Sequence, residues 1–162
     1  MNIRSAIEDD SGVIRSLIQE GIRANLGQHY SNEQIDAWSS GFSKESIGLA
    51  IKHTIALVAE IDGSVVGFGN IEISDDDMTE IHLLYVSPHH QRSGIGTSLI
   101  EQLEKHAMQA GKLLVQSDAS LLALGLLLKM GYSIRESYIK TYNGIEFPNT
   151  WVEKNLNKKD KP

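Results

Sequence analysis

Residues 83–100 read LLYVSPHHQRSGIGTSLI and decide the fold. The apolar run Leu83–Val86 predicts a strand, and the apolar spacing from Ile95 onward predicts an amphipathic helix. The turn between them contains Gly94 and Gly96, whose missing side chains let a ligand approach the backbone. The first amides of a helix have no partner within it, and together with the helix dipole they attract anions. The stretch therefore predicts a strand, a phosphate-binding turn and a helix.

The pattern Gly-x-Gly also occurs in ordinary tight turns between a strand and a helix. Two familiar phosphate-binding motifs do not fit, because the sequence has no Gly-Lys-Ser/Thr of a P-loop and no third glycine with an acidic residue at Rossmann spacing. Arg92 adds a positive charge beside the turn. The residues expected to hold an anion all lie in or beside this turn: Arg92, Ser93, Gly94, Ile95, Gly96 and Thr97.

The rest of the chain alternates between β and α patterns without an internal repeat or a linker, so we expect one domain over residues 1–156 and a flexible Lys-rich tail at 157–162. Asp62-Gly63 and Asn143-Gly144 are typical hairpin turns. This order predicts an α/β (α+β) fold, a mixed sheet with helices on both faces. The expected strands are 2–7, 54–61, 64–73, 78–87, 113–117, 132–141 and 145–155, and the expected helices are 11–24, one opening at 31, 43–51, 94–110 and 120–130.

Composition narrows the class of protein. The chain has 162 residues, of which 41% are hydrophobic and 22% charged, as in a globular domain. It has no cysteine, which excludes disulfides, a thiolate nucleophile and Cys-ligated metal, and makes the cytoplasm the expected location. The N-terminal residues lack the pattern of a signal peptide and no apolar stretch approaches the length of a membrane span, so no membrane association is expected.

The net charge of −6 is unevenly distributed. Residues 1–79 carry 5 Lys and Arg against 13 Asp and Glu. Nucleic acid is therefore not an expected partner, because phosphate binding needs a basic face. This acidic half would suit a cationic ligand, and it would equally serve as a solvated surface.

The motif Gln91-Arg92-Ser93-Gly94-Ile95-Gly96 resembles the Gln/Arg-x-x-Gly-x-Gly/Ala signature of the GCN5-related N-acetyltransferase (GNAT) superfamily. The strand Leu83–Val86 precedes it as in that superfamily, and 119–132 and 145–156 resemble its C-terminal helix and hairpin. The resemblance implies the GNAT acyl-CoA N-acyltransferase fold. It also implies an enzyme that transfers an acetyl group from acetyl-CoA to a primary amine by direct attack in a ternary complex.

The resemblance also assigns residues to the cofactor. The amides of the motif, from Gln91 through Thr97, would hold the pyrophosphate of coenzyme A. The strand before the motif would pair its backbone with the pantetheine arm at Leu84, Tyr85 and Val86, and an amide there would polarise the thioester carbonyl. Asp118 and Ser120 would either contact the pantetheine or cap the following helix.

An amine must lose a proton to attack, so a general base is expected. Glu80 is the first candidate, because some superfamily members carry their base glutamate eleven residues before the motif, as Glu80 precedes Gln91. His82 lies on the same face of the strand and could be the base, relay a proton or orient Glu80. The alternatives are a surface carboxylate and a hydrogen-bonded structural histidine.

The expected general acid is missing. Leu127 occupies the position of the superfamily's usual tyrosine and cannot donate a proton. A thiol with a pKa near ~8.5 is a tolerable leaving group. The coenzyme A thiolate would therefore be protonated by another group or by water, or it would leave without assistance. Tyr132, Tyr138 and Tyr142 lie nearby in sequence and are expected to pack the hairpin. Leu127 favours the alternative of a non-catalytic acyl-CoA-binding or regulatory module, whereas Glu80 beside His82 favours the enzyme.

The acceptor is less defined by the sequence. It is expected to be a small-molecule or peptide amine, drawn as a cation by the acidic half, and Trp38 and Phe42 would either belong to the core or line its pocket. Dimerisation is common in the superfamily, so the resemblance is compatible with a homodimer. No metal is expected, because the adjacent His89 and His90 would point to opposite sides of a strand and no His-x-x-x-His pattern exists.

Overall fold

The structure, a computed structural model, describes residues 1–24, 28–76 and 78–157. Apart from Asn157, the expected Lys-rich tail lies outside these residues. The elements follow in the order β1 (Asn2–Ser5), η1 (Glu8–Asp10), α1 (Ser11–Arg23), α2 (Asn32–Ser40), α3 (Lys44–His53), β2 (Ile55–Ile61), β3 (Ser64–Ile73), β4 (Thr79–Val86), η2 (Pro88–His90), α4 (Ile95–Gln109), β5 (Leu114–Ala119), α5 (Leu121–Lys129), β6 (Ser133–Tyr142) and β7 (Ile145–Asn155).

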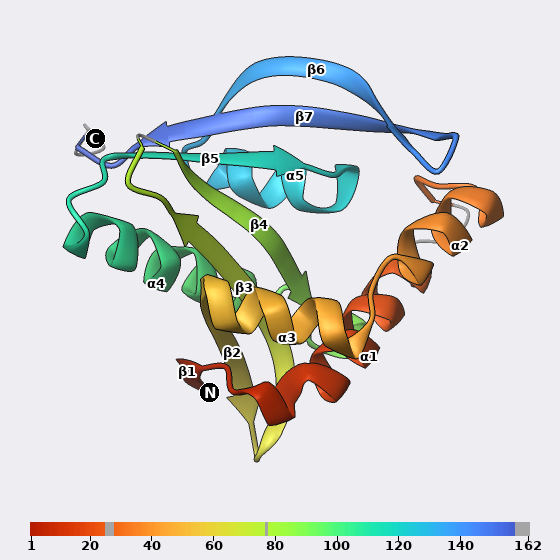
Figure 1. Ribbon diagram of the computed structural model, residues 1–162, viewed down its shortest axis with the longest axis horizontal. Coiled ribbons are helices and arrows are strands. Elements are labelled where there is room, and N and C mark those ends of the chain that lie inside the picture. Colours follow the sequence, from red (N-terminus) through yellow and green to blue (C-terminus); the bar gives the residue numbers. More distant parts are fainter. Residues whose placement is uncertain (25–27, 77, 158–162) are drawn as a thin grey trace.

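The strands form one mixed sheet in the order β1-β2-β3-β4-β5-β7-β6. Strands β1 to β4 pair antiparallel, β4 and β5 pair parallel, and β5, β7 and β6 pair antiparallel again. In Figure 1, β2, β3 and β4 lie along a common axis, alternating in direction, whereas β5, β6 and β7 lie along the upper edge at a steep angle to them. The sheet is thus divided between β4 and β5.

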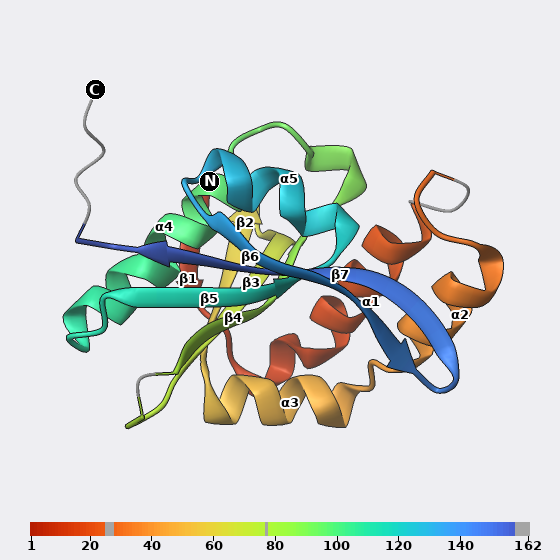
Figure 2. The same ribbon diagram turned by 90° about the horizontal axis from the view of Figure 1, so that it is seen from above.

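Helices cover both faces of this sheet, as the sequence predicts (Figure 2). One apolar cluster lies under α4 and α5, and the other lies under the three N-terminal helices. Among the described helices, none combines the length and the apolar character that crossing a membrane requires. The first cluster includes Ile71, Ile81, Leu99, Leu103 and Val152, and the second includes Ile14, Ile18, Ile35, Val58 and Phe68.

Local sequence explains most of the element boundaries. Ser31 begins α2 with a capping box, since its hydroxyl accepts from the Gln34 amide and the Gln34 side chain accepts from the Ser31 amide. In the two-residue hairpin turns Asp62-Gly63 and Asn143-Gly144, all four residues have positive φ, as a type I′ turn requires. The expected strands and helices are therefore confirmed to within a few residues, while the short helices η1 and η2 were not expected.

Candidate active site

The glycine-containing turn connects η2 to α4. Gly94 precedes the helix with φ of 81°, a left-handed conformation that glycine adopts without steric cost. Arg92 also has positive φ, at 58°, so the chain folds back sharply before the helix begins. Gly94 provides no side-chain cap, and the first amides of α4 are left to other partners. The Ser93 hydroxyl donates to the His90 carbonyl and holds the turn against η2.

The two glycines of the motif serve different purposes. A Cβ placed on Gly94 would meet nothing within 4 Å, so only the backbone conformation requires glycine there. A Cβ on Gly96 would lie 2.6 Å from Leu126 Cδ2, so this glycine allows α4 to pack closely against α5. The sequence predicts that both glycines allow a ligand to approach the backbone, which stays a prediction. The structure adds a packing role for Gly96.

Strands β4 and β5 are paired at one position and then separate. In the described part of the chain, the two strands pair at Glu80 and Gln116 alone, so the edge of β4 after this point has no strand beside it. On its other side β4 carries a bulge, because Ile81 pairs with Ile71 and Leu83 with Asn70, which leaves His82 without a partner residue. Bulges re-aim side chains next to functional sites.

The bulge is held by a buried asparagine. Asn70 is 2% exposed, and its Oδ1 accepts the Leu83 amide at 3.0 Å while its Nδ2 donates to Thr54 Oγ1 at 3.1 Å. The Leu83 amide would otherwise lack its regular partner in the strand ladder. Asn70 therefore stabilises the irregular backbone that sets the direction of His82.

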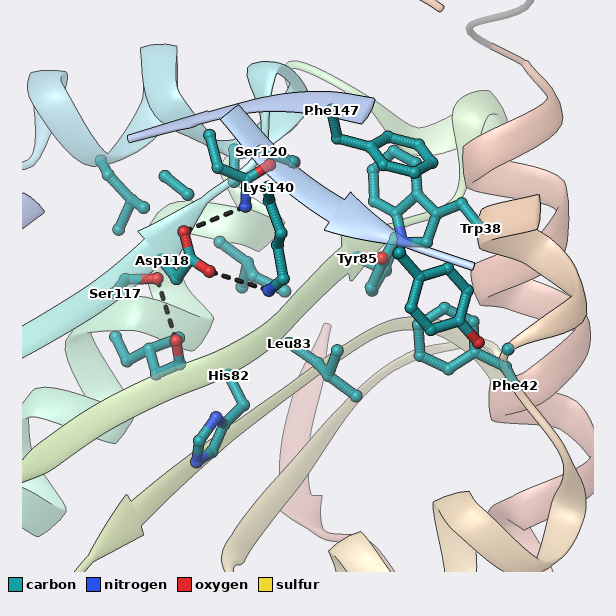
Figure 3. A pocket seen from close by; sticks show the side chains of 18 of the residues that line it. Trp38, Phe42, His82, Leu83, Tyr85, Ser117, Asp118, Ser120, Lys140 and Phe147 are labelled. Carbon is teal, nitrogen blue, oxygen red and sulfur yellow. Dashed lines mark hydrogen bonds and ion pairs between the residues drawn. The ribbon is translucent and has the colours of Figure 1, made fainter. Parts of the chain in front are cut away.

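A cavity of about 280 Å³ occupies the space where the strands part (Figure 3). Its size is close to the lower end of small-molecule sites. One end is apolar and lies against β4 and α5. The other end is formed by α2, the segment after it and the β6–β7 hairpin. The cavity lining includes Trp38, Phe42, His82, Leu84, Tyr85, Asp118, Ser120, Leu127, Lys140, Tyr142, Phe147 and Asn149.

Three titratable side chains meet on β3 and β4. His82 Nε2 lies 2.7 Å from Glu72 Oε2, and His82 Nδ1 lies 3.5 Å from Glu80 Oε1. His82 lines the cavity, whereas Glu80 lies behind it with only 17% of its side chain exposed. Burial raises the pKa of the Glu80 carboxyl above its ordinary value; His82 opposes this effect, and Asp118 and Glu72 reinforce it. The structure thus brings together the two candidate catalytic residues, Glu80 and His82.

Asp118 is fixed by three donors rather than capping a helix. Its carboxylate accepts from the Tyr138 hydroxyl at 2.8 Å, Lys140 Nζ at 2.9 Å and Asn149 Nδ2 at 3.0 Å. Burial acts to raise the pKa of Asp118, but these hydrogen bonds outweigh it and hold the pKa below its usual value. This group ties the end of β5 to the C-terminal hairpin.

Four of the aromatic residues that line the cavity make up what we call the aromatic wall: Trp38, Phe42, Tyr85 and Phe147. The Trp38 ring lies 6.5 Å from Tyr85 and 6.3 Å from Phe147, and Phe42 lies 6.2 Å from Tyr85 in an edge arrangement. The sequence left open whether Trp38 and Phe42 belong to the core or to a pocket. They take part in both, because each packs against the core and faces the cavity.

The acidic N-terminal half contributes no carboxylate to the described lining of the cavity. Of the described residues that line the cavity, those from 1–79 are aromatic or glycine: Tyr30, Trp38, Gly41 and Phe42. The acidic side chains Glu72 and Glu80 contact His82 instead. The expected attraction of a cationic amine by this half therefore stays a prediction, and the described cavity lining contains no carboxylate from residues 1–79 to support it.

The predicted cofactor residues lie in two groups. The motif residues Gln91 to Thr97 share one turn, while Leu84, Tyr85 and Ser120 line the cavity and Val86 packs against the core. Ser120 begins α5 without a side-chain cap bond. The Leu121 amide of that helix is satisfied instead by the Tyr30 hydroxyl at 3.0 Å. No sequence pattern indicated this contact across 91 residues.

The position expected for a general acid is occupied by an apolar side chain at the apolar end of the cavity. Leu127 lines the cavity there, at the position of the tyrosine expected from the superfamily. Tyr132 is buried, and its hydroxyl donates to Glu104. The Tyr138 hydroxyl donates to Asp118, and burial together with this hydrogen bond raises the pKa of Tyr138 to about 12. Tyr142 also lines the cavity, so the expectation that it only packs the hairpin is incomplete. Lys140, Asn149 and Phe147 were also missed, because nothing in their local sequence marks them.

Comparisons with known proteins agree with this geometry. Residues 23–132 match the model of the acetyltransferase (GNAT) family. No curated protein sequence matches the chain significantly. Among solved structures, the GCN5-related N-acetyltransferase (aminotransferase, class II) of Rhodopseudomonas palustris is 29% identical with a TM-score of 0.87, covering 96% of this chain and 95% of that one.

Two further structures contain the cofactor. The PaiA N-acetyltransferase of Thermoplasma acidophilum, in complex with coenzyme A, is 21% identical with a TM-score of 0.80, covering 95% of this chain and 98% of that one. The yncA structure from Salmonella typhimurium, with its cofactor acetyl-CoA, is 20% identical with a TM-score of 0.68, covering 100% and 97%. The predicted fold and enzyme class are thus confirmed, and the chain belongs to the acetyltransferase (GNAT) family.

Proposed function

We propose that this chain transfers the acetyl group of acetyl-CoA directly to a primary amine bound in the same complex. The observation that carries the proposal is the position of the cavity. It opens where β4 and β5 part, with His82 in its lining and Glu80 in contact with His82, and β4 leads from there to the turn before α4. An anion-binding turn and a proton acceptor therefore lie at the two ends of one strand.

The residues present fit coenzyme A. The left-handed Gly94 and the free first amides of α4 suit a pyrophosphate, with Arg92 exposed beside them. The edge of β4 has no strand partner after Glu80, so the backbone at Leu84, Tyr85 and Val86 can pair with the pantetheine arm. Ser120 would contact the arm where it enters the cavity.

Acetyl-CoA supplies the acyl group as a thioester. The neutral amine nitrogen attacks the carbonyl carbon, the carbon–sulfur bond breaks, and the amine loses one proton. We assign acceptance of that proton to Glu80, with His82 carrying it, because His82 lines the cavity and its Nδ1 lies 3.5 Å from Glu80. Nε2 of His82 must leave its contact with Glu72 to take the proton from the amine. Since Leu127 cannot donate, the thiolate takes its proton from water.

The test is release of free thiol from acetyl-CoA with a panel of primary amines. Glu80→Gln should lower kcat about 10²-fold or more. The matched control is Glu101→Gln, which alters an exposed carboxylate on α4 and should leave kcat unchanged.

In the wild type, kcat/KM should fall as the pH drops through the raised pKa of Glu80, above its ordinary 4.5. Tight coenzyme A binding without turnover of any amine would instead support a non-catalytic acyl-CoA-binding module.

A further inference from the structure

The acceptor side of the cavity combines exposed aromatic surface with a shortage of free negative charge. In the aromatic wall, Phe147 is 7% exposed, whereas Trp38, Phe42 and Tyr85 remain only partly buried. These three rings come from α2, the segment after it and β4, and Figure 3 shows them gathered on one side of the pocket. Rings that keep open surface toward a cavity offer a platform for another flat or apolar group.

The charges of the cavity are already matched. Among the described residues that line it, the one carboxylate is Asp118, and all three of its hydrogen bonds come from the C-terminal hairpin. One of these donors is Lys140, whose ammonium group lies 2.9 Å from the Asp118 carboxylate, so the two charges compensate each other. The carboxylates that contact the cavity residue His82 are Glu72 and Glu80. A ligand with several positive charges would therefore meet no uncompensated carboxylate among the described residues that line the cavity.

We infer that the acceptor is a primary amine carried on an aromatic or large apolar group, with no second positive charge. This inference rests on the proposed function, because it names the substrate class of the same site. The amino group lies toward His82, and the apolar group lies against Trp38, Phe42 and Tyr85. Polyamines and other polycations are disfavoured, because desolvating a second ammonium group without a partner is costly.

The first experiment compares three amines by thiol release from acetyl-CoA. The probes are 2-phenylethylamine, propylamine and spermidine, which differ in aromatic surface and in number of charges. The value of kcat/KM should be about 10- to 100-fold higher for 2-phenylethylamine than for propylamine, since burying a ring contributes that much binding. It should also exceed the value for spermidine. A preference for spermidine would overturn the inference while leaving the proposed function intact.

The second experiment removes rings from the wall. Trp38→Leu should lower kcat/KM for 2-phenylethylamine about tenfold or more, and for propylamine by less than about threefold. Trp151→Leu is the matched control, because Trp151 is a partly buried tryptophan on β7 that does not line this cavity. Should Trp38→Leu fail to fold, Phe42→Leu tests the same wall. An equal loss for both amines would overturn the inference.

A binding measurement separates the two proposals. Calorimetry with 2-phenylethylamine on the wild-type chain saturated with coenzyme A needs no turnover. Binding that weakens about tenfold in Trp38→Leu, without thiol release from acetyl-CoA by any amine, would support the substrate class and reject the catalytic function. Absence of both binding and turnover would overturn both.

Discussion

The two regions that the proposed function uses, a cofactor end and an acceptor end, are built by different parts of the polypeptide. The proposed cofactor end consists of the turn Gln91–Thr97, which lies outside the cavity lining, and the open edge of β4, and its donors would be backbone amides. The acceptor end consists of the aromatic wall and the Asp118 group, and its chemistry is carried by side chains from α2, β4, β5, β6 and β7. Backbone groups are the same in every residue, so the cofactor end depends on conformation, whereas the acceptor end depends on residue identity.

This difference predicts how substitutions act. At the cofactor end, a change should matter where it alters φ or adds charge, and all acceptors should be affected together. At the acceptor end, a change should alter the choice of amine or the stability of the hairpin, while the affinity for acetyl-CoA stays the same.

The largest effect is expected at Gly94. Gly94→Asp forces a non-glycine residue to φ of 81° and places a negative charge where the phosphates would bind. The affinity for acetyl-CoA should fall about 10²-fold or more, as measured by calorimetry.

Gly111 provides a matched control for this change. It follows α4, has φ of 75° and, like Gly94, has nothing within 4 Å of an added Cβ. Gly111→Asp therefore carries a similar backbone cost, yet the affinity for acetyl-CoA should stay within about twofold. Retained affinity in Gly94→Asp would show that the pyrophosphate does not bind at this turn.

A smaller effect is expected at Asn70, which holds the strand that joins the two ends. Asn70→Ala removes the acceptor for the Leu83 amide and should lower kcat about tenfold, because His82 loses its fixed direction. Leaving a buried amide unpaired should also lower the free energy of unfolding by roughly 1–3 kcal/mol. Both quantities can be measured by steady-state kinetics and urea unfolding.

Thr54→Val separates the bulge from general stability. It removes the partner of Asn70 Nδ2 but leaves the bond from the Leu83 amide to Asn70 Oδ1 in place. The free energy of unfolding should fall comparably while kcat stays near the wild-type value. Equal losses of kcat in both variants would mean that the bulge has no special role in directing His82.

The smallest effect is expected at Asp118 and concerns pH. Its pKa is lower in the folded state than its ordinary 3.8, so its contribution to stability is present above that value and is lost as the pH falls through the lowered pKa. Asp118→Asn should cost roughly 1–2 kcal/mol at pH 7, as measured by urea unfolding, and the difference should shrink below about pH 3.8.

The same unfolding experiment has an internal reference in Asp36→Asn. The Asp36 side chain is 73% exposed and lies 3.6 Å from Arg23, so its loss should change the free energy of unfolding by less than about 0.5 kcal/mol at any pH. A loss of stability in Asp118→Asn that did not change with pH would contradict the assignment of an ionised, hydrogen-bonded Asp118.

The residues whose positions follow from their neighbours in the chain could be predicted from the sequence. Glu80 and His82 were expected to share a face, and their side chains do lie within 3.5 Å of each other. The bulge at His82 was not expected, because its cause is Asn70 on the adjacent strand. The packing role of Gly96 was not expected, since its contact with Leu126 on α5 cannot be read from the motif.

The amino-acid sequence by itself determined the strand, turn and helix of residues 83–110, the hairpins at Asp62-Gly63 and Asn143-Gly144, and the family. These features depend on φ preferences, apolar period and helix-start amides, all of which act over a few residues. The tertiary structure alone decided what faces the acceptor. Trp38, Asp118 and Phe147 are far apart in the chain. They line one cavity because β4 and β5 part and the C-terminal hairpin folds over the gap. Packing over such distances follows from the burial of whole elements, which no local pattern encodes.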